Sequence, residues 1–302
     1  MSEARAGRLP ASEPRARLRG TTRLVGVMGW PVTHSLSPVI HNAAFLALGM
    51  DWAYVPLPVP PGALDRALPG LGSLGLVGAN VTMPHKGTCA ELIEDLSEDA
   101  RRLRAVNTVM VDGQGLSGHN TDAPGFERFL RDDAGFDPAG RAATLFGAGG
   151  AARACALALA RGGLERLTVA AREPDRAAPL RDTLSAVGTE LTVVPFGRAT
   201  EVRADLVVNA TPVGGSGERL PVPPLGPEVL VVDLLYRPSL TPLLAEARAA
   251  GAAAFGGLGL LLHQAALSFE LWTGQPPPLD VMSAAALAEL AEFPEGGPSA
   301  AI

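Results

Sequence analysis

Lysine occurs once in this chain, and its rarity points to proton transfer. Of the 25 basic residues, 24 are arginine and one is Lys86, which lies in the segment NVTMPHKG. Arginine serves wherever a surface positive charge is enough, but its guanidinium keeps its proton in a protein, whereas a lysine ammonium can release one. The alternative is a lysine that survives by chance on a solvated loop. The chemistry favours a catalytic, proton-transferring Lys86.

Amide side chains form a second group that is suited to ligand recognition. The chain has five asparagines: Asn42, Asn80, Asn107, Asn120 and Asn209. Each lies where a strand is predicted to end, a turn to form or a helix to begin. An amide both donates and accepts hydrogen bonds, which suits a ligand with several hydroxyl groups, but asparagine is also a common turn and cap residue. For any one of them alone, the turn role is favoured.

Hydroxyl and carboxylate side chains stand at two predicted helix starts. Ser35 and Ser37 precede Pro38, which suits a first helical turn, and Ser37 is the predicted N-cap of a helix over residues 39–48. Hydroxyls in front of a helix N-terminus also favour a bound anion, so capping and anion binding are alternatives for both serines. Asp122 opens another predicted helix, where its charge alone would stabilise the first turn.

A glycine-rich turn joins a strand predicted over residues 143–146 to a helix predicted over residues 151–161. Gly147, Gly149 and Gly150 form the turn, and Ala152 takes the third position of the fingerprint, where alanine is permitted. Such a turn directs backbone N–H groups and a helix N-terminus at a pyrophosphate. In this strand, turn and helix context, dinucleotide binding is favoured over a purely structural turn.

The strand predicted over residues 167–171 bears on which dinucleotide is bound. In an NAD enzyme it would end near an acidic residue that holds the ribose 2′-hydroxyl. Here it runs into AREPDR, in which Arg172 and Arg176 suit a 2′-phosphate, whereas Glu173 would repel one if it pointed inward. We therefore predict NADP as the cofactor; solvated surface charge is the alternative role of both arginines.

Strands and helices interleave along the chain, which predicts an α/β fold. Further strands are predicted over residues 23–28, 52–59, 76–81, 205–209 and 230–234, with a hairpin over 105–111 and 116–119. Because loops after parallel strands form the ligand crevice, we expect Tyr236 to face it. Two closing helices are predicted over residues 260–272 and 280–290. The first carries His263 and Gln264, which must face different directions.

Composition excludes several classes of protein. The 302 residues are 47% hydrophobic and 19% charged, which predicts two folded domains. The longest run without polar side chains, residues 252–262, is too short to cross a bilayer. The net charge of −6 becomes −9 without residues 1–20, a predicted disordered tail of charge +3, so nucleic acid is not an expected partner. Two cysteines and scattered histidines predict no disulfide framework and no metal site, which fits the cytoplasm.

Eight motifs resemble those of the shikimate dehydrogenases. In family order they are GWPVTHSLSPVIHNAAF, NVTMPHK, AVNTV, GHNTDAPGF, GAGGAAR, VNATPVG, DLLYRPSLTPLL and GLGLLLHQAALSFELWTG, and they span about residues 24–275. The resemblance therefore covers most of the chain. It implies the reversible, NADP-dependent conversion of 3-dehydroshikimate and shikimate in aromatic amino-acid biosynthesis.

The resemblance also implies a role for individual residues. Lys86 and Asp122 are the implied catalytic pair, and which of them carries the proton stays open. Ser35, Ser37 and Tyr236 are implied to hold the substrate carboxylate, and Asn80, Thr82, Asn107 and Gln264 the ring hydroxyls. The implied cofactor contacts are Gly147, Ala148, Gly149, Gly150, Ala151, Arg172, Arg176, Asn209, Ala210, Thr211, Leu234 and Gly257. The chain departs from the family pattern at Glu173, Gly256 and His263.

The implied organisation has two domains. Residues 21–122 and 260–292 form the substrate-binding catalytic domain, and residues 123–259 the NADP-binding Rossmann domain, so that the last helices fold back onto the first domain. A monomer or homodimer that binds a small-molecule substrate is expected. The alternatives are a quinate/shikimate or aminoshikimate dehydrogenase with broader substrate or NAD use, a methylenetetrahydrofolate dehydrogenase, and a non-catalytic nucleotide sensor. The serine pair and the asparagines argue against a methylenetetrahydrofolate dehydrogenase. Lys86 and Asp122 argue against a non-catalytic sensor.

Overall fold

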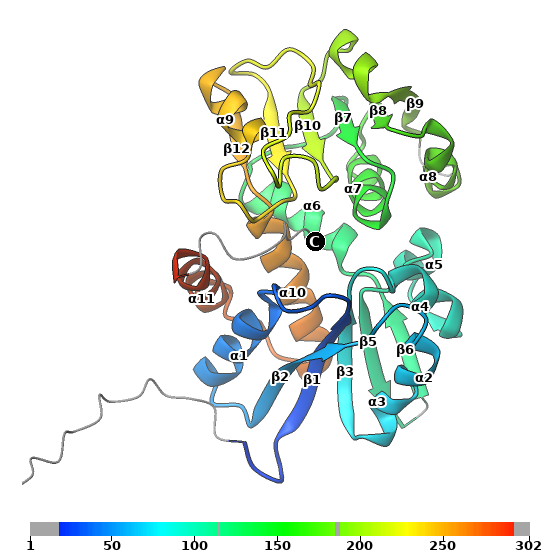
Figure 1. Cartoon of the computed structure of the whole chain (residues 1–302), viewed down its shortest axis with the longest axis vertical. Helices are drawn as coiled ribbons and strands as arrows, with labels where there is room; N and C mark the ends of the chain where they lie inside the picture. Colours follow the sequence, from blue (N-terminus) through cyan, green and yellow to red (C-terminus); the bar gives the residue numbers. More distant parts are fainter. Residues whose placement is uncertain (1–17, 114, 185–187, 293–302) are drawn as a thin grey trace, which may run out of the picture.

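The computed structural model describes residues 18–113, 115–184 and 188–292, except for the side chain of Arg176 (Figure 1). Most of the predicted N-terminal tail, residues 1–17, lies outside the described residues, as do residues 293–302. The described residues form two six-stranded sheets, one above the other along the long axis in Figure 1, with helices packed against both. The predicted α/β fold is confirmed.

The first sheet is mixed and comes from the N-terminal part of the chain. Its strands lie in the order β2 (Trp52–Pro58), β1 (Arg23–Gly29), β3 (Leu76–Val81), β5 (Thr108–Asp112), β6 (Gly115–His119) and β4 (Asp95–Leu96). β1 is parallel to β2 and β3, whereas β5 and β6 form the predicted antiparallel hairpin. The last five residues of β1 are all buried, as expected for a central strand covered on both faces.

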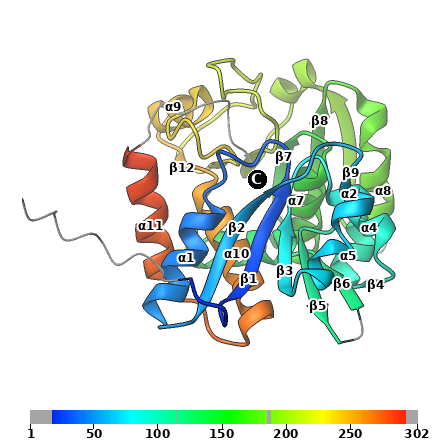
Figure 2. The ribbon, with the colours of Figure 1, turned by 60° about the horizontal axis from the view of Figure 1, so that its bottom comes forward.

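Helices cover both faces of this sheet. One face packs against α2 (Leu64–Ala67), α3 (Gly70–Ser73), α4 (Lys86–Leu92) and α5 (Glu98–Leu103). The other packs against α1 (Ser37–Ala47), α10 (Leu258–Thr273) and α11 (Leu279–Glu292). Figures 1 and 2 both show α11 beside α1, although the two are far apart in the sequence. The predicted return of the C-terminal helices to the first sheet is confirmed.

Helix α1 corrects two predictions. Ser37 is the first helical residue rather than the N-cap, and Leu36 takes the N-cap position without a side-chain hydrogen bond. Asn42 lies inside α1 rather than at a turn or helix start. Its amide donates to the Tyr54 carbonyl oxygen at 2.9 Å and accepts from the Tyr54 N–H at 2.8 Å. Because β2 is an edge strand, Asn42 satisfies backbone groups that the sheet leaves unpaired.

The second sheet is entirely parallel and has the strand order of a doubly wound dinucleotide-binding fold. Its strands lie in the order β12 (Ala253–Phe255), β11 (Leu230–Asp233), β10 (Leu206–Asn209), β7 (Ala142–Phe146), β8 (Arg166–Ala171) and β9 (Glu190–Pro195). The order reverses between β7 and β10, and ligands bind at the carboxyl ends of strands at such a switch point. Every residue of β7, β10 and β11 is buried, which explains why these strands are mostly apolar.

Helices α7 (Gly150–Arg161), α8 (Ala178–Leu184) and α9 (Pro242–Ala249), with 3-10 turns at Pro174–Ala177 and Phe196–Glu201, complete the second unit. Helix α6 (Asp122–Asp132) joins the two sheets and packs against both α7 and α10. A second connection runs between α5 and α7, where Leu103 packs with Ala154 and Leu157 and where Asp99 forms an ion pair with Arg161. The two units are therefore joined through α6 and in direct contact between α5 and α7.

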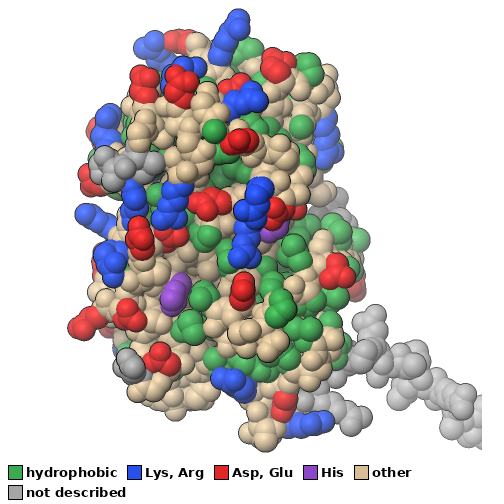
Figure 3. Space-filling view, turned by 180° about the vertical axis from the view of Figure 1, so that it is seen from behind, with side chains coloured by type: hydrophobic (Ala, Val, Ile, Leu, Met, Phe, Trp, Pro, Cys, Tyr) green, Lys and Arg blue, Asp and Glu red, His purple; other side chains and the backbone are tan. Residues whose placement is uncertain are grey.

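No helix among the described residues combines the length and the apolar character that a membrane crossing requires. Figure 3 shows one face of the molecule, on which acidic and basic side chains are interspersed. Such mixed charge is typical of a solvated surface.

Candidate active site

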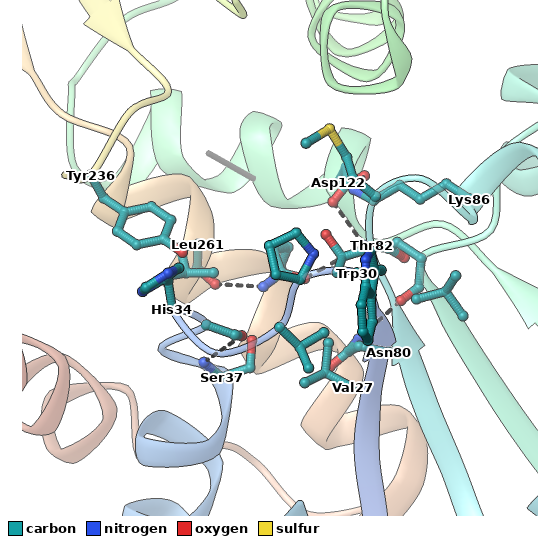
Figure 4. A pocket seen from close by; sticks show the side chains of 17 residues that line it. Val27, Trp30, His34, Ser37, Asn80, Thr82, Lys86, Asp122, Tyr236 and Leu261 are labelled. Atoms are coloured by element: carbon teal, nitrogen blue, oxygen red, sulfur yellow. Dashed lines mark hydrogen bonds and ion pairs between the residues drawn. The ribbon is translucent and has the colours of Figure 1, made fainter. Parts of the chain in front are cut away.

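A pocket of about 290 Å³ opens where the loops that follow β1, β3 and β11 meet α6 and α10 (Figure 4). All nine predicted catalytic and substrate-binding residues line it: Ser35, Ser37, Asn80, Thr82, Lys86, Asn107, Asp122, Tyr236 and Gln264. Figure 4 shows Ser37, His34 and Tyr236 on one side of the pocket and Asn80, Thr82 and Asp122 on the other. Folding therefore brings these distant segments to one place, and the expectation that Tyr236 faces the crevice is confirmed.

Lys86 and Asp122 form an ion pair at one wall of the pocket. Lys86 Nζ donates to Asp122 Oδ2 at 2.7 Å, and their side chains are 12% and 3% exposed. The other carboxylate oxygen, Oδ1, accepts from Asn107 Nδ2 at 2.8 Å. Asp122 is also the first residue of α6, where the helix dipole favours a negative charge. Each carboxylate oxygen thus has its own donor, which fixes the direction from which the ammonium faces the pocket.

Three amide side chains are held by a buried hydrogen-bond network. Asn80 accepts from the Tyr54 hydroxyl at 2.8 Å, and its Nδ2 lies 3.1 Å from the Asn107 carbonyl oxygen. Asn107 Oδ1 accepts from the Thr121 N–H at 2.8 Å. Gln264 Nε2 donates to the Leu261 carbonyl oxygen at 2.8 Å, which leaves its Oε1 3.5 Å from Asn107 Nδ2. These amides are oriented before any ligand binds, which suits recognition of ring hydroxyls.

The opposite side of the pocket is suited to an anion. Ser35 and Ser37 line it at the start of α1, and the Ser37 N–H donates to Ser35 Oγ at 3.3 Å. The N-terminal end of a helix carries a partial positive charge, which two adjacent hydroxyl donors reinforce. Burial raises the pKa of Tyr236 to about 12, so its phenol stays protonated and can donate.

His263 and Gln264 do face different directions, as predicted. Gln264 lines the pocket, whereas His263 Nε2 lies 3.2 Å from Asp133 Oδ1, beside the end of α6. His263 is 3% exposed. It therefore belongs to the contact between α6 and α10 rather than to the pocket.

The predicted dinucleotide turn lies between β7 and α7, and its shape fits a bound pyrophosphate. Gly147 has a φ of +110°, and a Cβ there would lie 2.9 Å from the Ala210 carbonyl oxygen, so the position needs glycine. At Gly149 and Gly150 a Cβ would meet nothing within 4 Å. Open space in front of the N-terminus of a 12-residue helix is what a pyrophosphate requires. Ala148 lies in the turn and Ala151 in the first turn of α7, and the sequence predicts that both contact the cofactor.

The other predicted cofactor residues surround this turn or support it. Arg172 is exposed at the end of β8, with its Cζ 6.0 Å from the centre of the Phe196 ring, and the side chain of Arg176 lies outside the described residues. Gly257 packs so closely on Leu234 that a Cβ would lie 2.1 Å from the Leu234 carbonyl oxygen. Ala210 and Thr211 follow β10, and Thr211 donates to Asn209 Oδ1 through both its N–H and its hydroxyl, at 3.0 and 2.7 Å.

Asn209 is fully buried and bound within the protein. Its Nδ2 donates to Asp233 Oδ1 at 2.9 Å, and Asp233 Oδ2 accepts from the Thr241 hydroxyl at 2.7 Å. Burial raises the pKa of Asp233, and the hydrogen bonds from Thr241, the Leu235 N–H and Asn209 act in the opposite direction. These hydrogen bonds connect the loops that follow β10 and β11. Asn209 therefore stabilises the carboxyl end of the second sheet rather than facing solvent.

Sequence reasoning missed the residues behind the pocket wall. Tyr54, Thr108, Thr121 and Ser268 are all buried and hydrogen-bonded to the amides that line the pocket. Ser268 could have been found from the sequence, because it lies four residues after Gln264 and therefore on the same face of α10. The other three lie in strands or loops whose neighbours only the tertiary structure defines. Asp233 was missed for the same reason.

Hydride transfer to a polar substrate requires a bound dinucleotide and, beside it, a pocket in which a proton can move. The second sheet and its glycine turn suit the dinucleotide, and the pocket with Lys86 and Asp122 suits the proton transfer. The fold and the site thus define a dinucleotide-dependent oxidoreductase. Two family models match the chain: the shikimate dehydrogenase substrate-binding domain over residues 27–109, and the shikimate 5′-dehydrogenase C-terminal domain over residues 257–287.

Individual relatives agree with these models. The chain is 43% identical to the shikimate dehydrogenase (NADP(+)) of Desulforamulus reducens over 276 residues, 88% of this chain and 95% of that protein. A shikimate 5-dehydrogenase of Thermus thermophilus, solved with NADP(H) and shikimate, is 40% identical with a TM-score of 0.78, covering 88% and 99% of the two chains. A quinate dehydrogenase of Corynebacterium glutamicum, solved with NAD, is 34% identical with a TM-score of 0.79 over the same shares. The chain belongs to the shikimate dehydrogenase family.

Proposed function

We propose that this protein catalyses the reversible, NADPH-dependent reduction of 3-dehydroshikimate to shikimate in chorismate and aromatic amino-acid biosynthesis. The observation that carries the proposal is the Lys86–Asp122 pair, 2.7 Å apart, in a pocket with oriented amides on one side and an anion-favouring helix start on the other. That arrangement matches a hydroxylated ring with a carboxylate at one end.

Each residue of the pocket has a task in this proposal. Ser35, Ser37 and Tyr236 hold the substrate carboxylate, because hydroxyl donors converge there at the start of α1. Asn80, Thr82, Asn107 and Gln264 bind the ring hydroxyls. A substrate anchored at both ends presents the reacting carbon in one orientation, which is worth several kcal/mol of the barrier.

Lys86 and Asp122 handle the proton. In the direction of reduction, the carbonyl carbon gains a hydride and the carbonyl oxygen gains a proton from Lys86 Nζ; in oxidation the hydroxyl returns that proton to Lys86. Asp122 holds the ammonium through Oδ2 and is itself held by Asn107. When bound, NADP supplies or accepts the hydride. Lys86, whose side chain is 12% exposed, regains a proton from bulk water after reduction and gives one up to it after oxidation.

The glycine turn and Arg172 hold the cofactor in this proposal. The turn receives the pyrophosphate, because Gly149 and Gly150 face open space at the start of α7. Arg172, exposed at the end of β8, binds the 2′-phosphate that distinguishes NADP from NAD, and Arg176 assists it. A second candidate function is a quinate/shikimate or aminoshikimate dehydrogenase with broader substrate or NAD use. Glu173, next to Arg172, favours it because a carboxylate there repels a 2′-phosphate.

Initial rates of reduced-nicotinamide formation test the proposal across four pairs: shikimate or quinate with NADP or NAD. We expect turnover with shikimate and NADP and at least about tenfold lower kcat/KM for the other three pairs. Comparable turnover with quinate or NAD would move the protein to the second candidate. No turnover, together with tight NADP binding, would make it a nucleotide sensor.

We also propose the organisation that goes with this function. The substrate-binding domain comprises residues 21–122 and 260–292, and the NADP-binding domain residues 123–259; each contains one of the two sheets. The protein acts in the cytoplasm as a monomer or homodimer. Limited proteolysis tests the domain boundaries, and sedimentation measures the oligomeric state. An assembly larger than a dimer in solution would contradict the proposed oligomeric state.

A further inference from the structure

A buried serine connects the elements from which the pocket amides come. Ser268 is fully buried in α10, and its Oγ lies 3.0 Å from Asn80 Nδ2, 2.8 Å from Thr108 Oγ1 and 3.2 Å from Thr121 Oγ1. It also donates to the Gln264 carbonyl oxygen at 3.1 Å. One hydroxyl thus joins β3, β5, the start of α6 and α10 behind the pocket wall.

The hydrogen-bond partners of Asn80 determine which of its two polar ends faces the ligand. Its Nδ2 has two hydrogens and three acceptors around it: the Asn107 carbonyl oxygen, Thr108 Oγ1 and Ser268 Oγ. The carbonyl oxygen can only accept, so the amide nitrogen must point toward it. Both amide hydrogens are therefore used inside the protein. On the other side, Oδ1 accepts from Tyr54 and keeps one lone pair free.

The Asn107 amide is bound within the protein on both sides. Its Oδ1 accepts from the Thr121 N–H at 2.8 Å and from the Thr108 hydroxyl at 3.0 Å, which uses both lone pairs. Its Nδ2 donates to Thr121 Oγ1 at 2.9 Å and to Asp122 Oδ1 at 2.8 Å, so both of its amide hydrogens are used inside the protein as well. The two asparagines therefore differ: Asn80 keeps a free lone pair on Oδ1, whereas the lone pairs and hydrogens of the Asn107 amide are all used.

We propose that Ser268 is a positioning residue that, together with the Asn107 carbonyl oxygen and Thr108, holds the Asn80 amide with Oδ1 toward the pocket, so that the ligand group opposite Asn80 has to be a hydrogen-bond donor. A hydroxyl or an amine satisfies this condition, and an ether, a fluorine or a hydrogen atom does not. The inference rests on the proposed function, in which Asn80 binds a ring hydroxyl. It adds the residue that sets the direction of that hydrogen bond.

Removing the serine hydroxyl tests the inference. In Ser268→Ala the Asn80 amide keeps the Asn107 carbonyl oxygen and Thr108 Oγ1 as acceptors but loses the third, so its orientation is held less firmly. We therefore expect the KM for shikimate to rise about three- to tenfold, with less than about twofold change in kcat and in the KM for NADP. Ser268→Cys, which keeps a weak acceptor of similar size, should lie between Ser268→Ala and the unmodified protein. Thermal unfolding establishes that each variant is folded.

Helix α10 offers a matched control. The Thr273 hydroxyl donates to the Phe269 carbonyl oxygen four residues earlier, as Ser268 does to Gln264, but it has no contact with the pocket amides. Thr273→Val therefore removes the same kind of helix-backbone hydrogen bond, and we expect it to leave the KM for shikimate within about twofold.

Two measurements separate positioning from a general loosening of the fold. Shikimate analogues in which one ring hydroxyl is replaced by hydrogen or fluorine identify the group opposite Asn80. For that analogue alone, Ser268→Ala should raise the KM less than about twofold, because the hydrogen bond to Asn80 is already missing. In an Asn80→Ala background, Ser268→Ala should likewise have no further effect.

The outcomes are distinct. Three results would overturn the inference and leave the proposed function standing. They are an equal rise in KM for every analogue, additive effects of Ser268→Ala and Asn80→Ala, and an unchanged KM for shikimate in Ser268→Ala. If the unmodified protein does not turn over shikimate at all, the proposed function fails and the inference with it.

Discussion

At the scale of single residues, the chemistry depends on an ammonium group in the place where a proton must move. Lys86 Nζ lies 2.7 Å from Asp122 Oδ2, and the only lysine of the chain thus stands beside a buried carboxylate in the pocket. Arginine supplies all the other basic side chains. Its guanidinium would keep the charge and the ion pair at this position, but it would not release a proton.

Lys86→Arg separates charge from proton transfer. We expect kcat to fall by about 10²–10⁴-fold, the range that a general acid or base contributes, while the KM for NADP stays within about twofold. Steady-state kinetics in both directions measure the effect. Near-normal turnover in Lys86→Arg would rule out Lys86 as the proton carrier.

Asp122→Asn is the companion variant. It keeps the shape of the side chain and removes the charge that holds the ammonium, so we expect a smaller loss of kcat, about 10- to 10²-fold, than in Lys86→Arg. The reverse order of the two effects would make Asp122 the proton carrier.

At the scale of elements, the turn between β7 and α7 shows how glycines at neighbouring positions serve different ends. Gly147 is required by the chain itself, since its φ is +110° and a side chain would meet Ala210. Gly149 has an ordinary extended conformation with φ −75° and ψ −170°, and a Cβ there would meet no protein atom within 4 Å. The protein itself would therefore tolerate a side chain at Gly149, and the proposed reason for glycine at this position is the pyrophosphate.

Gly149→Ala is expected to weaken cofactor binding without weakening the fold. A methyl group in the space for the pyrophosphate should raise the KM for NADP at least about tenfold, whereas the thermal midpoint stays within about 2 °C. Gly70→Ala, in α3, is the matched control, because a Cβ there also meets nothing within 4 Å and the position is remote from the turn. A KM for NADP that is equal in the two variants would contradict the assignment of the turn.

At the scale of the whole molecule, His41 lies where α1, the first sheet and α10 meet. Its ring stacks on Tyr54 with centres 4.5 Å apart and planes 2° apart, and it also contacts Trp272. Neither ring nitrogen has a hydrogen-bond partner among the described residues. Burial lowers the pKa of His41 from 6.5 to about 3, so the folded protein holds this imidazole neutral.

This histidine makes stability depend on pH. Between about 3 and 6.5 the unfolded chain binds a proton at His41 that the folded protein does not, so the free energy of unfolding falls as the pH decreases through 6.5. At pH 5 the loss amounts to about 2 kcal/mol. His41→Phe keeps an aromatic ring in the stack but has no group that takes up a proton. We expect it to remove this loss from the difference between the free energies of unfolding at pH 7 and pH 5, measured by denaturant unfolding.

His119 provides the control for that experiment. Burial lowers the pKa of His119 too, but it is only half-buried and the charge of Asp95 acts in the opposite direction. His119→Gln should therefore change the dependence much less than His41→Phe. Equal pH dependence in His41→Phe and the unmodified protein would show that His41 is not held neutral in the fold.

Much of the secondary structure followed from local patterns. The strand over 76–81 was predicted with the bounds of β3, and the glycine turn lies between β7 and α7 as expected, because buried runs and glycine turns are signals of a few consecutive residues. Two local predictions were wrong: that Ser37 caps the helix, and that Asn42 lies at a turn or helix start. Both depended on the environment of α1: Asn42 bonds to the edge of β2, which no pattern within α1 encodes.

The kind of chemistry could be predicted from the sequence, through a single lysine, a strand–glycine–helix unit, and serines and asparagines at the ends of elements. The orientation of the amides and the residues that support them could not, because they depend on contacts between distant segments. Ser268 meets Asn80 across 188 positions of sequence and Thr121 across 147. Local periodicity reports which face of an element is buried, but the partner of a buried polar group depends on how distant elements pack, and that is settled only when the whole chain folds.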